Sequence, residues 1–518
     1  MRPKKFARYG CALATARARK GRGAKMRSRR NFAIAGFVTA LLAFGPLPAA
    51  FAQEGGRSVD GGRNNTASGG GSNGGNSASD PGPRAGSVGA GKPLSSLSAA
   101  ELTFFLNGLQ RFGQVDSVTG SIPGEPGSGL GPGFNSNSCQ SCHSQPAPGG
   151  SSPSTHAFPN IGQNPQIAAA VDASASNKVP FFVTANGPVR EARFPFVVSN
   201  NSVTSTPDGG VHDLFTITGR TDAVGCNLAQ PNFEEMEQLG NLIFRIPTPT
   251  FGSGLMENIP DATIVANMNA NASLKQALGI TGQPNTSGND GTITRFGWKA
   301  QNKSLEIFAG EAYNVEIGVT NELFPNERNE PPSSCLFNPT PEDSTNFTVA
   351  GANIPSDTVQ FAMFMRFLAP PAPSAQGIPG NPSIQSIQNG ARVFAQAHCD
   401  MCHTPTLQTG SSAFTSGLNN QTAALFSDLL IHHMGSGLAD NVSQGAAGPD
   451  QFRTAPLWGV GQRVFFLHDG RANPTNGGLM NAIQAHASQG SEANTVISIF
   501  NGMSASQQQD LLNFLRSL

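Results

Sequence analysis

Two short stretches of the chain repeat one arrangement of cysteine and histidine. "SCQSCH" and "HCDMCH" each place two cysteines three positions apart and a histidine directly after the second: Cys139, Cys142 and His143, then Cys399, Cys402 and His403. Two thiols at this spacing can reach the two vinyl groups on one edge of a haem, and the next imidazole then falls beneath the iron. The spacing therefore predicts two covalently bound c-type haems, with His143 and His403 as iron ligands.

Zinc is the alternative interpretation of these pairs, because two C-x-x-C units also build four-cysteine zinc sites. The chain has only nine histidines in 518 residues, and a four-cysteine site needs none of them beside either pair. A histidine directly after both pairs therefore favours haem.

The N-terminus has the pattern of an export signal, and thioether-bound haem is formed outside the cytoplasm. Residues 26–52 have a basic start, an apolar run and an A-F-A ending suited to signal peptidase. We expect residues 1–52 to be a signal region, with translation starting at Met26, and the protein to be periplasmic or secreted. Arg29 and Arg30 also fit a twin-arginine signal, which ranks second because haem is attached after unfolded export. No stretch approaches twenty apolar residues, so no membrane span is expected.

Removal of the signal region changes the charge of the chain. Residues 1–52 hold 12 of the 33 Lys and Arg and none of the 33 Asp and Glu, so the remainder carries a net charge near −12. Nucleic acid is therefore not an expected partner. Such a surface would attract a small basic electron carrier, although simple solubility explains the charge equally well.

The remaining cysteines predict a disulfide. Cys11 lies in the signal region and four cysteines bind haem, which leaves Cys226 and Cys335. Thiols left over in an oxidising compartment usually pair. Two separately buried free cysteines are the alternative.

Composition divides the rest of the chain into three parts. Residues 53–93 are rich in Gly, Ser and Asn and cannot bury enough apolar surface to become ordered, so a disordered leader is expected. "RFLAPPAPSAQGIPGNPS", residues 366–383, reads as a linker. The predicted division is an N-terminal haem domain over 94–369, with a long insertion, and a C-terminal cytochrome c domain over 370–518.

Helical periodicity surrounds both cysteine motifs. "LSAAELTFFLNGLQRFG" predicts a helix capped by Ser98, and "SIQSIQNGARVFAQA" predicts another directly before the second motif. The first should bury an apolar face of Leu97, Leu102, Phe105, Leu106, Leu109 and Phe112. The chain ends in an amphipathic segment with Ser506 and Gln509 as a candidate capping box. We expect this last helix to pack across the helix before the second motif.

Between the motifs the pattern is weaker. "FPFVVSN" and "HDLFTITG" predict short strands, and most of residues 157–290 reads as loop. "SDTVQFAMFMRFL" predicts a helix before the linker. The expected fold class is mainly α with long loops and a few short strands, forming two cytochrome c-like domains that each carry one covalent haem.

With these features placed, the sequence resembles a known family. "IPTPTFGSGLMENIPD", "RFGWKAQNKSLEIFAGEAYNVEIGVTN" and "FRTAPLWGVGQRVFFLHDGRA" are similar to the di-haem oxidoreductases, also catalogued as thiol oxidoreductase-like proteins. That family is related to the bacterial di-haem cytochrome c peroxidases and the MauG group. The resemblance covers roughly residues 95–518 and implies a peroxidase-like oxidoreductase.

The resemblance implies two catalytic residues. Trp298 in "RFGWKA" matches a tryptophan that passes electrons between the haems in the peroxidase relatives, and a core tryptophan is the alternative. Glu316 in "YNVEIG" matches a glutamate over the peroxide-binding haem, where it would move a proton during O–O cleavage. Glu311 and Glu306 are its competitors. The methionine that usually follows in the relatives is Ile317 here.

The second axial ligand decides the role of each iron. His486 falls where the relatives place a methionine on the electron-transfer haem, so it is the predicted partner of His403. Met434 is the main alternative ligand, and His432 and His433 are further alternatives.

For the first haem the prediction is an open or water-bound iron, with His156 as a candidate gating ligand. His468 matches a histidine that the relatives keep near the haem interface, which implies a structural hydrogen-bonding role. The relatives also hold calcium between the domains, and "RTAPL", residues 453–457, falls near that site without an acidic cluster.

These features together predict an enzyme that reduces hydrogen peroxide with electrons from a small donor such as a cytochrome c or cupredoxin. One alternative is a haem-dependent dioxygenase of an apolar substrate, as in distantly similar rubber-cleaving proteins. The other is a non-catalytic electron-transfer cytochrome.

Overall fold

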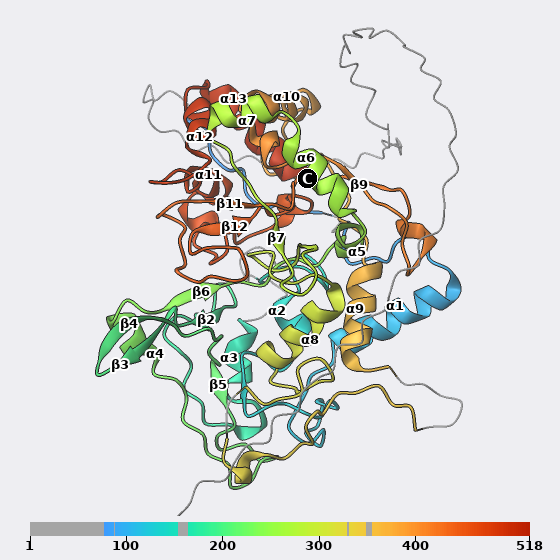
Figure 1. Cartoon of the computed structure of the whole chain (residues 1–518), viewed down its shortest axis with the longest axis vertical. Helices are drawn as coiled ribbons and strands as arrows, with labels where there is room; N and C mark the ends of the chain where they lie inside the picture. Colours follow the sequence, from blue (N-terminus) through green and yellow to red (C-terminus); the bar gives the residue numbers. More distant parts are fainter. Residues whose placement is uncertain (1–76, 87–88, 154–163, 329–330, 349–354) are drawn as a thin grey trace, which may run out of the picture. The chain divides into compact units, whose positions relative to one another are not determined.

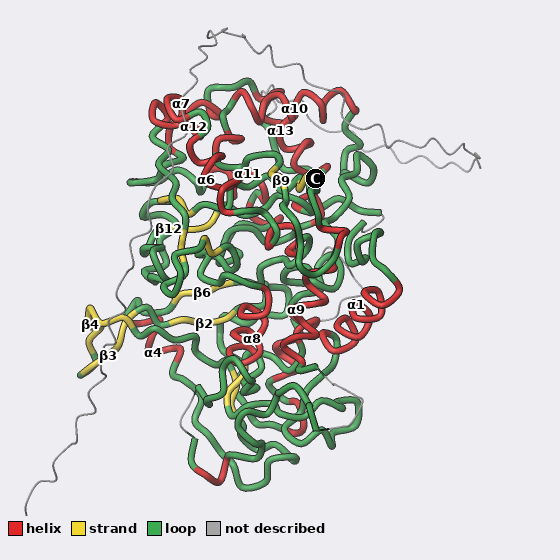
Figure 2. Tube along the Cα trace, turned by 45° about the vertical axis from the view of Figure 1, so that its right-hand side comes forward, coloured by secondary structure: helices red, strands yellow, loops and turns green. Residues whose placement is uncertain are grey.

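The computed structural model describes residues 77–86, 89–153, 164–328, 331–348 and 355–518. The expected signal region, residues 1–52, and the candidate ligand His156 lie outside the described residues. Loops make up much of the described chain, helices are the main regular element and strands are short (Figure 2). The predicted mainly α class with long loops and few short strands is confirmed.

Thirteen α-helices lie within the described residues (Figure 1). They are α1 (Ala99–Phe112), α2 (Cys139–Cys142), α3 (Pro165–Ala169), α4 (Phe233–Gln238), α5 (Ser253–Glu257), α6 (Asp261–Asn269), α7 (Ala272–Leu278), α8 (Leu305–Glu316), α9 (Asp357–Phe367), α10 (Ile384–Gln396), α11 (Gly478–Gln484), α12 (Asn494–Asn501) and α13 (Ala505–Ser517). In this part of the chain no helix is both long and apolar enough to cross a membrane.

The strands of the described residues form two-stranded antiparallel pairs. The pairs are β1 (Gly133–Phe134) with β5 (Phe215–Thr216), β2 (Glu191–Arg193) with β6 (Ile243–Arg245), β3 (Phe196–Ser199) with β4 (Ser202–Pro207), β7 (Asn285–Thr286) with β8 (Ile293–Thr294), β9 (Leu407–Gln408) with β10 (Thr422–Ala423), and β11 (Ile431–His433) with β12 (Gln451–Arg453). Strands β3 and β5 confirm the two stretches predicted to be extended.

Helix α1 packs against α9 next to the first cysteine motif. Phe105, Gly108 and Phe112 form its buried face, and a Cβ atom at Gly108 would lie 2.5 Å from a backbone carbonyl oxygen of α9. The predicted face was too broad, because Leu102 and Leu106 are 38% and 52% exposed. The close approach at Gly108 decides which part of the apolar stripe α9 covers.

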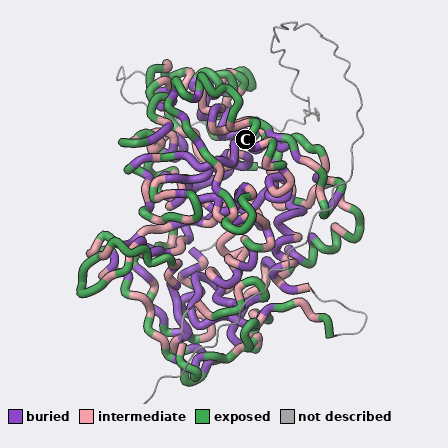
Figure 3. Tube along the Cα trace, viewed as in Figure 1, coloured by how far each residue is buried: buried purple, intermediate pink, exposed green. Residues whose placement is uncertain are grey.

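Helix α13 packs across α10, as predicted for the helix before the second motif (Figure 1). Their contact is close at Gly390, where an added Cβ atom would clash with a backbone oxygen of α13. The capping box of α13 differs from the prediction: Ser504 and Gln507 form it, and Ser506 lies inside the first turn. A second apolar core includes Val393 and Phe394 of α10 and Leu511, Leu512, Phe514 and Leu515 of α13. Figure 3 shows the buried positions of the described chain in purple.

Part of the segment expected to be a disordered leader is held against the fold. Asp80 accepts two hydrogen bonds from Arg516, at 2.7 Å from Nε and 2.5 Å from Nη2, and both side chains are buried. A buried guanidinium needs a carboxylate partner, and this sequence supplies it from the Gly/Ser-rich segment. The composition of the segment could not predict this contact, because a single residue, Asp80, makes it.

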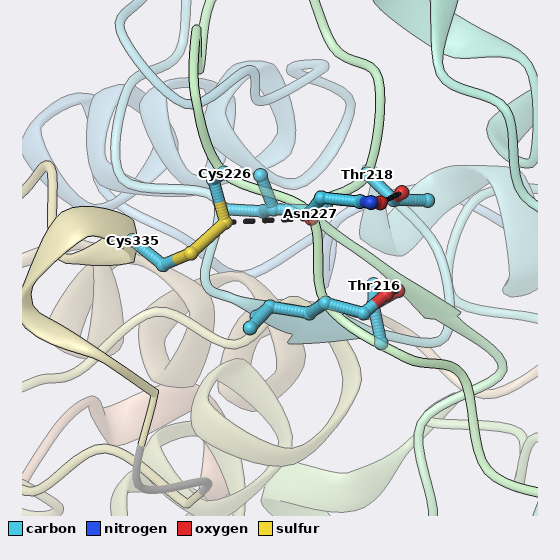
Figure 4. Close-up of a disulfide and its surroundings, with 7 residues drawn as sticks. Thr216, Thr218, Cys226, Asn227 and Cys335 are labelled. Carbon is cyan, nitrogen blue, oxygen red and sulfur yellow. Dashed lines mark hydrogen bonds between the residues drawn. A yellow bond between two sulfur atoms is a disulfide. The ribbon is translucent and has the colours of Figure 1, made fainter.

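Cys226 and Cys335 form a disulfide, as predicted (Figure 4). The bond joins the loop after β5 to a short helical turn 109 residues later. Strand β5 pairs with β1, which leads into the first cysteine motif. The disulfide therefore restrains the loops that frame that motif.

Candidate functional site

The two cysteine motifs line two different cavities. The first contains Cys139 and Cys142, and the second contains Cys399 and Cys402. The four thiols are therefore not arranged as one four-cysteine zinc site.

Among the described residues, one other group has metal-ligand chemistry, and it includes a cysteine of the second motif. Cys402, Asp428 and His432 bring ligand atoms within 4.8 Å of one another. However, both imidazole nitrogens of His432 face carboxylates, Asp428 at 3.0 Å and Glu492 at 2.8 Å. The ring is thus already engaged on both sides.

Each motif histidine is fixed by its Nδ1 atom. His143 Nδ1 lies 3.0 Å from the carbonyl oxygen of Gly150, and His403 Nδ1 lies 3.0 Å from that of Phe426. Donation from Nδ1 to a carbonyl leaves Nε2 as the atom that can bind iron. Burial lowers the pKa of both histidines to about 4, so both rings are neutral and available as ligands at pH 7.

Each cavity also contains a guanidinium with buried N–H groups that lack a partner. In the first cavity this is Nε of Arg190, and in the second it is Nε and Nη2 of Arg463. Unpaired buried donors are costly, so they indicate an anionic partner that is absent from the protein itself. The propionate groups of haem have this charge. The cysteine pairs, the fixed histidines and these guanidinium groups together fit one haem in each cavity.

Glu316 ends helix α8 and lines the first cavity. Its carbonyl oxygen accepts hydrogen bonds from the backbone N–H groups of Asn135 and Ser136, and the Asn135 side chain donates to the carbonyl of Val315. Residues 135 and 136 lead directly into the first motif. These bonds therefore attach the end of α8 to the loop that carries Cys139.

A second carboxyl group, Glu191 of β2, faces Glu316 in the same cavity. Burial raises the pKa of Glu316 well above its usual value, and the neighbouring charge of Glu191 adds to this shift. Burial acts on Glu191 in the same sense, but Arg193, 3.1 Å away, and the hydrogen bond with Glu316 hold the pKa of Glu191 below its usual value. The two pKa values are thus shifted in opposite directions, so Glu316 holds a proton in preference to Glu191.

The other glutamates of α8 are placed differently. Glu311 also lines the first cavity, but the amide of Asn302 donates to its carboxylate. Glu306 lies in the first turn of α8 and is not part of the cavity lining.

Trp298 lines both cavities, and no other described residue does so. Its Nε1–H donates to the carbonyl of Ile246 at 2.9 Å, which fixes the indole ring. The Arg463 guanidinium lies 5.8 Å from the ring centre, and the His468 ring meets it edge-on at 6.4 Å. The second tryptophan, Trp458, is buried in the main apolar core and lines neither cavity.

Three of the predicted axial ligands, His486, Met434 and His432, line the second cavity together with His403. His486 follows α11, and its Nδ1 lies 2.7 Å from the carbonyl of Ala482, so its Nε2 is available. It is close enough to His403 that each would disfavour a positive charge on the other. Met434 also lines this cavity, whereas His433 is exposed and paired with Asp450.

The first cavity contains one thioether that the sequence analysis did not single out. Met365 of α9 lines this cavity one turn after Phe361, and both Phe361 and His143 contact the ring of Phe112. No sequence motif marks Met365, Glu191 or Arg463, because each reaches its cavity through the fold.

His468 stacks on Phe452 with ring centres 4.4 Å apart, and its carbonyl accepts a hydrogen bond from Ile246. Residues 453–457, near which the resemblance implies calcium, do not fit that ion. The carbonyl of Thr454 accepts from the Ser427 hydroxyl at 2.6 Å and from the Arg453 guanidinium at 3.3 Å. A guanidinium in this position would repel Ca²⁺, which prefers several carboxylate and carbonyl oxygens.

Comparison with known proteins agrees with this geometry. The family model described as "Di-haem oxidoreductase, putative peroxidase" matches residues 201–518, which include the second motif, Trp298 and Glu316. The first motif precedes the matched region. No curated protein matches the chain.

Two solved structures give weak matches. Hydrazine synthase of Kuenenia stuttgartiensis is 16% identical with a TM-score of 0.20, and the match covers 31% of this chain and 55% of that one. A MauG-like protein associated with microbial copper homeostasis is 14% identical with a TM-score of 0.27, and the match covers 52% of this chain and 90% of that one. Neither TM-score supports an argument. The family model alone covers more than half of the chain, and on that ground the protein belongs to the di-haem oxidoreductases.

Proposed function

We propose that this di-haem oxidoreductase is a c-type peroxidase that reduces hydrogen peroxide with electrons from a small redox protein. The observation that carries the proposal is the first cavity, where Glu316 lines the same space as Cys139, Cys142 and His143. When bound, the first haem would supply the iron at which the O–O bond is reduced, and the second would store electrons.

The two facing carboxyl groups are suited to move protons. Reduction of one peroxide to two waters consumes two electrons and two protons. In this pair Glu191 would accept the proton of peroxide, and Glu316 would return one to the oxygen that leaves as water. Arg193 keeps the negative charge on Glu191, which leaves Glu316 as the proton donor.

Trp298 would carry electrons between the two cavities. An indole is the easiest neutral side chain to oxidise at such a position, and this one lies against both cavities. His403 and His486 would hold the second haem, which would supply stored electrons, and Trp298 would pass them toward the first cavity.

The lining of the first cavity also bears on the alternatives. Ionisable side chains of Glu191, Arg193, Arg245 and Glu316 line it, which suits a small polar substrate such as peroxide. A purely electron-carrying protein would need a second strong ligand on both irons. In the first cavity Met365 is the only imidazole or thioether besides His143 among the described lining residues.

The proposal includes location and partners. Covalent attachment at both motifs would give one haem to each of two cytochrome c-like domains, 94–369 and 370–518, in a periplasmic or secreted protein. The negative charge of the chain after residue 52 suits a small basic donor of the cytochrome c or cupredoxin kind.

Substitution of Glu316 tests the proposal. Glu316→Gln should lower kcat/KM for hydrogen peroxide by about 10²- to 10⁴-fold, the usual contribution of a positioned acid or base, with little change in the haem spectrum. Glu306→Gln, in the first turn of the same helix, is the matched control and should turn over at the wild-type rate. Wild-type turnover by Glu316→Gln would remove this residue from the mechanism.

A further inference from the structure

An ammonium group is enclosed by oxygen atoms in the wall between the two cavities. Lys299 Nζ lies 3.0 Å from Oδ1 of Asp440 and donates to the carbonyl oxygens of Gly448 at 2.8 Å and Gln451 at 3.0 Å, with that of Pro449 at 3.4 Å. The side chains of Lys299 and Asp440 are both fully buried. The three N–H groups of the ammonium therefore have three close oxygen partners.

These oxygens belong to one loop, residues 440–451, which we call the oxygen loop. It wraps around the ammonium and ends at β12. Asn285 further fixes the arrangement, because its amide donates to the carbonyl of Lys299 and to that of Gln444, both at 2.9 Å. The oxygen loop therefore contacts Lys299 directly at its ammonium group and through Asn285 at its backbone carbonyl.

The enclosed ammonium and its partner Asp440 contact residues that line each of the two cavities. Asp440 also accepts from Arg245, at 2.6 Å from Nη2, and Arg245 lines the first cavity. The ammonium lies 4.1 Å from the ring centre of Phe452, which lines the second cavity and stacks on His468. Lys299 directly follows Trp298, the residue that lines both cavities.

We infer that the ammonium of Lys299 is the resident cation of this wall, occupying the place of a metal ion, and that truncation of the lysine opens a site for a divalent cation such as Ca²⁺. A carboxylate and three backbone carbonyls form an oxygen set that a hard cation would accept, with water completing its coordination.

The amine is a cation at neutral pH. Burial lowers the pKa of Lys299 to about 8, and the neighbouring Asp440 opposes this shift. The inference does not depend on the peroxidase proposal, since it concerns only the groups of the wall.

The test uses the haem-loaded wild-type protein and two variants, measured by thermal unfolding and calorimetric titration with Ca²⁺. Lys299→Ala vacates the site. Lys303→Ala is the matched control, because Lys303 is partly exposed and pairs with Asp290 at the surface.

Wild type and Lys303→Ala should unfold at the same temperature in EDTA and in millimolar CaCl₂. Lys299→Ala should unfold a few degrees lower in EDTA, recover part of this loss in CaCl₂, and bind one Ca²⁺ more than wild type. Lys299→Met fills the space without charge, so it should lose stability and gain no response to Ca²⁺.

Two results would overturn the inference: a wild-type protein that loses stability in EDTA and regains it with Ca²⁺, or a Lys299→Ala protein whose stability and Ca²⁺ binding equal those of wild type. Should Lys299→Ala fail to fold, the wild-type response to EDTA and the loss of stability in Lys299→Met decide the question. None of these readouts is enzymatic, so failure of the peroxidase proposal would leave them unchanged.

Discussion

Removal of the Cys226–Cys335 disulfide should cost stability without disturbing either haem site. The bond closes a loop of 109 residues, for which the chain-entropy relation gives about 5 kcal/mol of stabilisation. The unit from Gly74 to Leu518 should unfold with an entropy near 0.9 kcal/mol/K, estimated from about 2.1 cal/mol/K per residue. The expected decrease in Tm is therefore about 5 °C.

Scanning calorimetry of the Cys226→Ser/Cys335→Ser protein measures this decrease. Wild type treated with a phosphine reductant is the matched control and should lose about the same amount, because thioether bonds to haem resist the reagent. The Tm of the double variant should not change when the reductant is added. A decrease below about 1 °C, or a reductant effect in the double variant, would refute the reasoning, since the entropy of so long a loop predicts several degrees.

Three further substitutions test individual residues of the site. His486→Ala should turn the second haem high-spin in its optical spectrum, whereas Met434→Leu should not; the reverse result would make Met434 the ligand. Trp298→Phe should slow electron transfer between the haems in stopped-flow reduction, and Trp458→Phe, in the apolar core, should not; equal rates in wild type and Trp298→Phe would exclude the indole as the route. Glu492 has a pKa of about 2, below its unfolded value because His432 and backbone N–H groups outweigh the effect of burial, so its stabilisation is present above pH 4.5 and lost as the pH falls toward 2. Urea unfolding should show a loss of about 3 kcal/mol over this range that is absent in Glu492→Gln, and parallel pH profiles would contradict the assignment.

Local patterns in the sequence predicted the parts of the fold that depend on neighbouring residues. The helix behind Ser98, the helix that precedes the second motif and the terminal helix all form where periodicity indicated, although the cap of the last lies two residues before the predicted one. The C-x-x-C-H spacing likewise marked both cavities, because one helical turn sets the distances between its residues.

Contacts between distant parts of the chain could not be predicted in this way. The hydrogen bond from Lys299 to Gln451 spans 152 residues, and that from Arg245 to Asp440 spans 195. Glu191 reaches Glu316 through a three-residue strand that carries no motif. The predicted buried face of α1 was too broad for the same reason, because the position of α9 decides which apolar residues of α1 are covered.

The central claim is that each C-x-x-C-H motif holds its own covalent haem. A mass spectrum of the denatured, mature protein tests it most directly, because only covalent groups survive denaturation. Our account predicts the polypeptide mass plus two haems, with one haem on the proteolytic peptide of Cys139 and Cys142 and the other on that of Cys399 and Cys402. A spectrum that shows the bare polypeptide would contradict it.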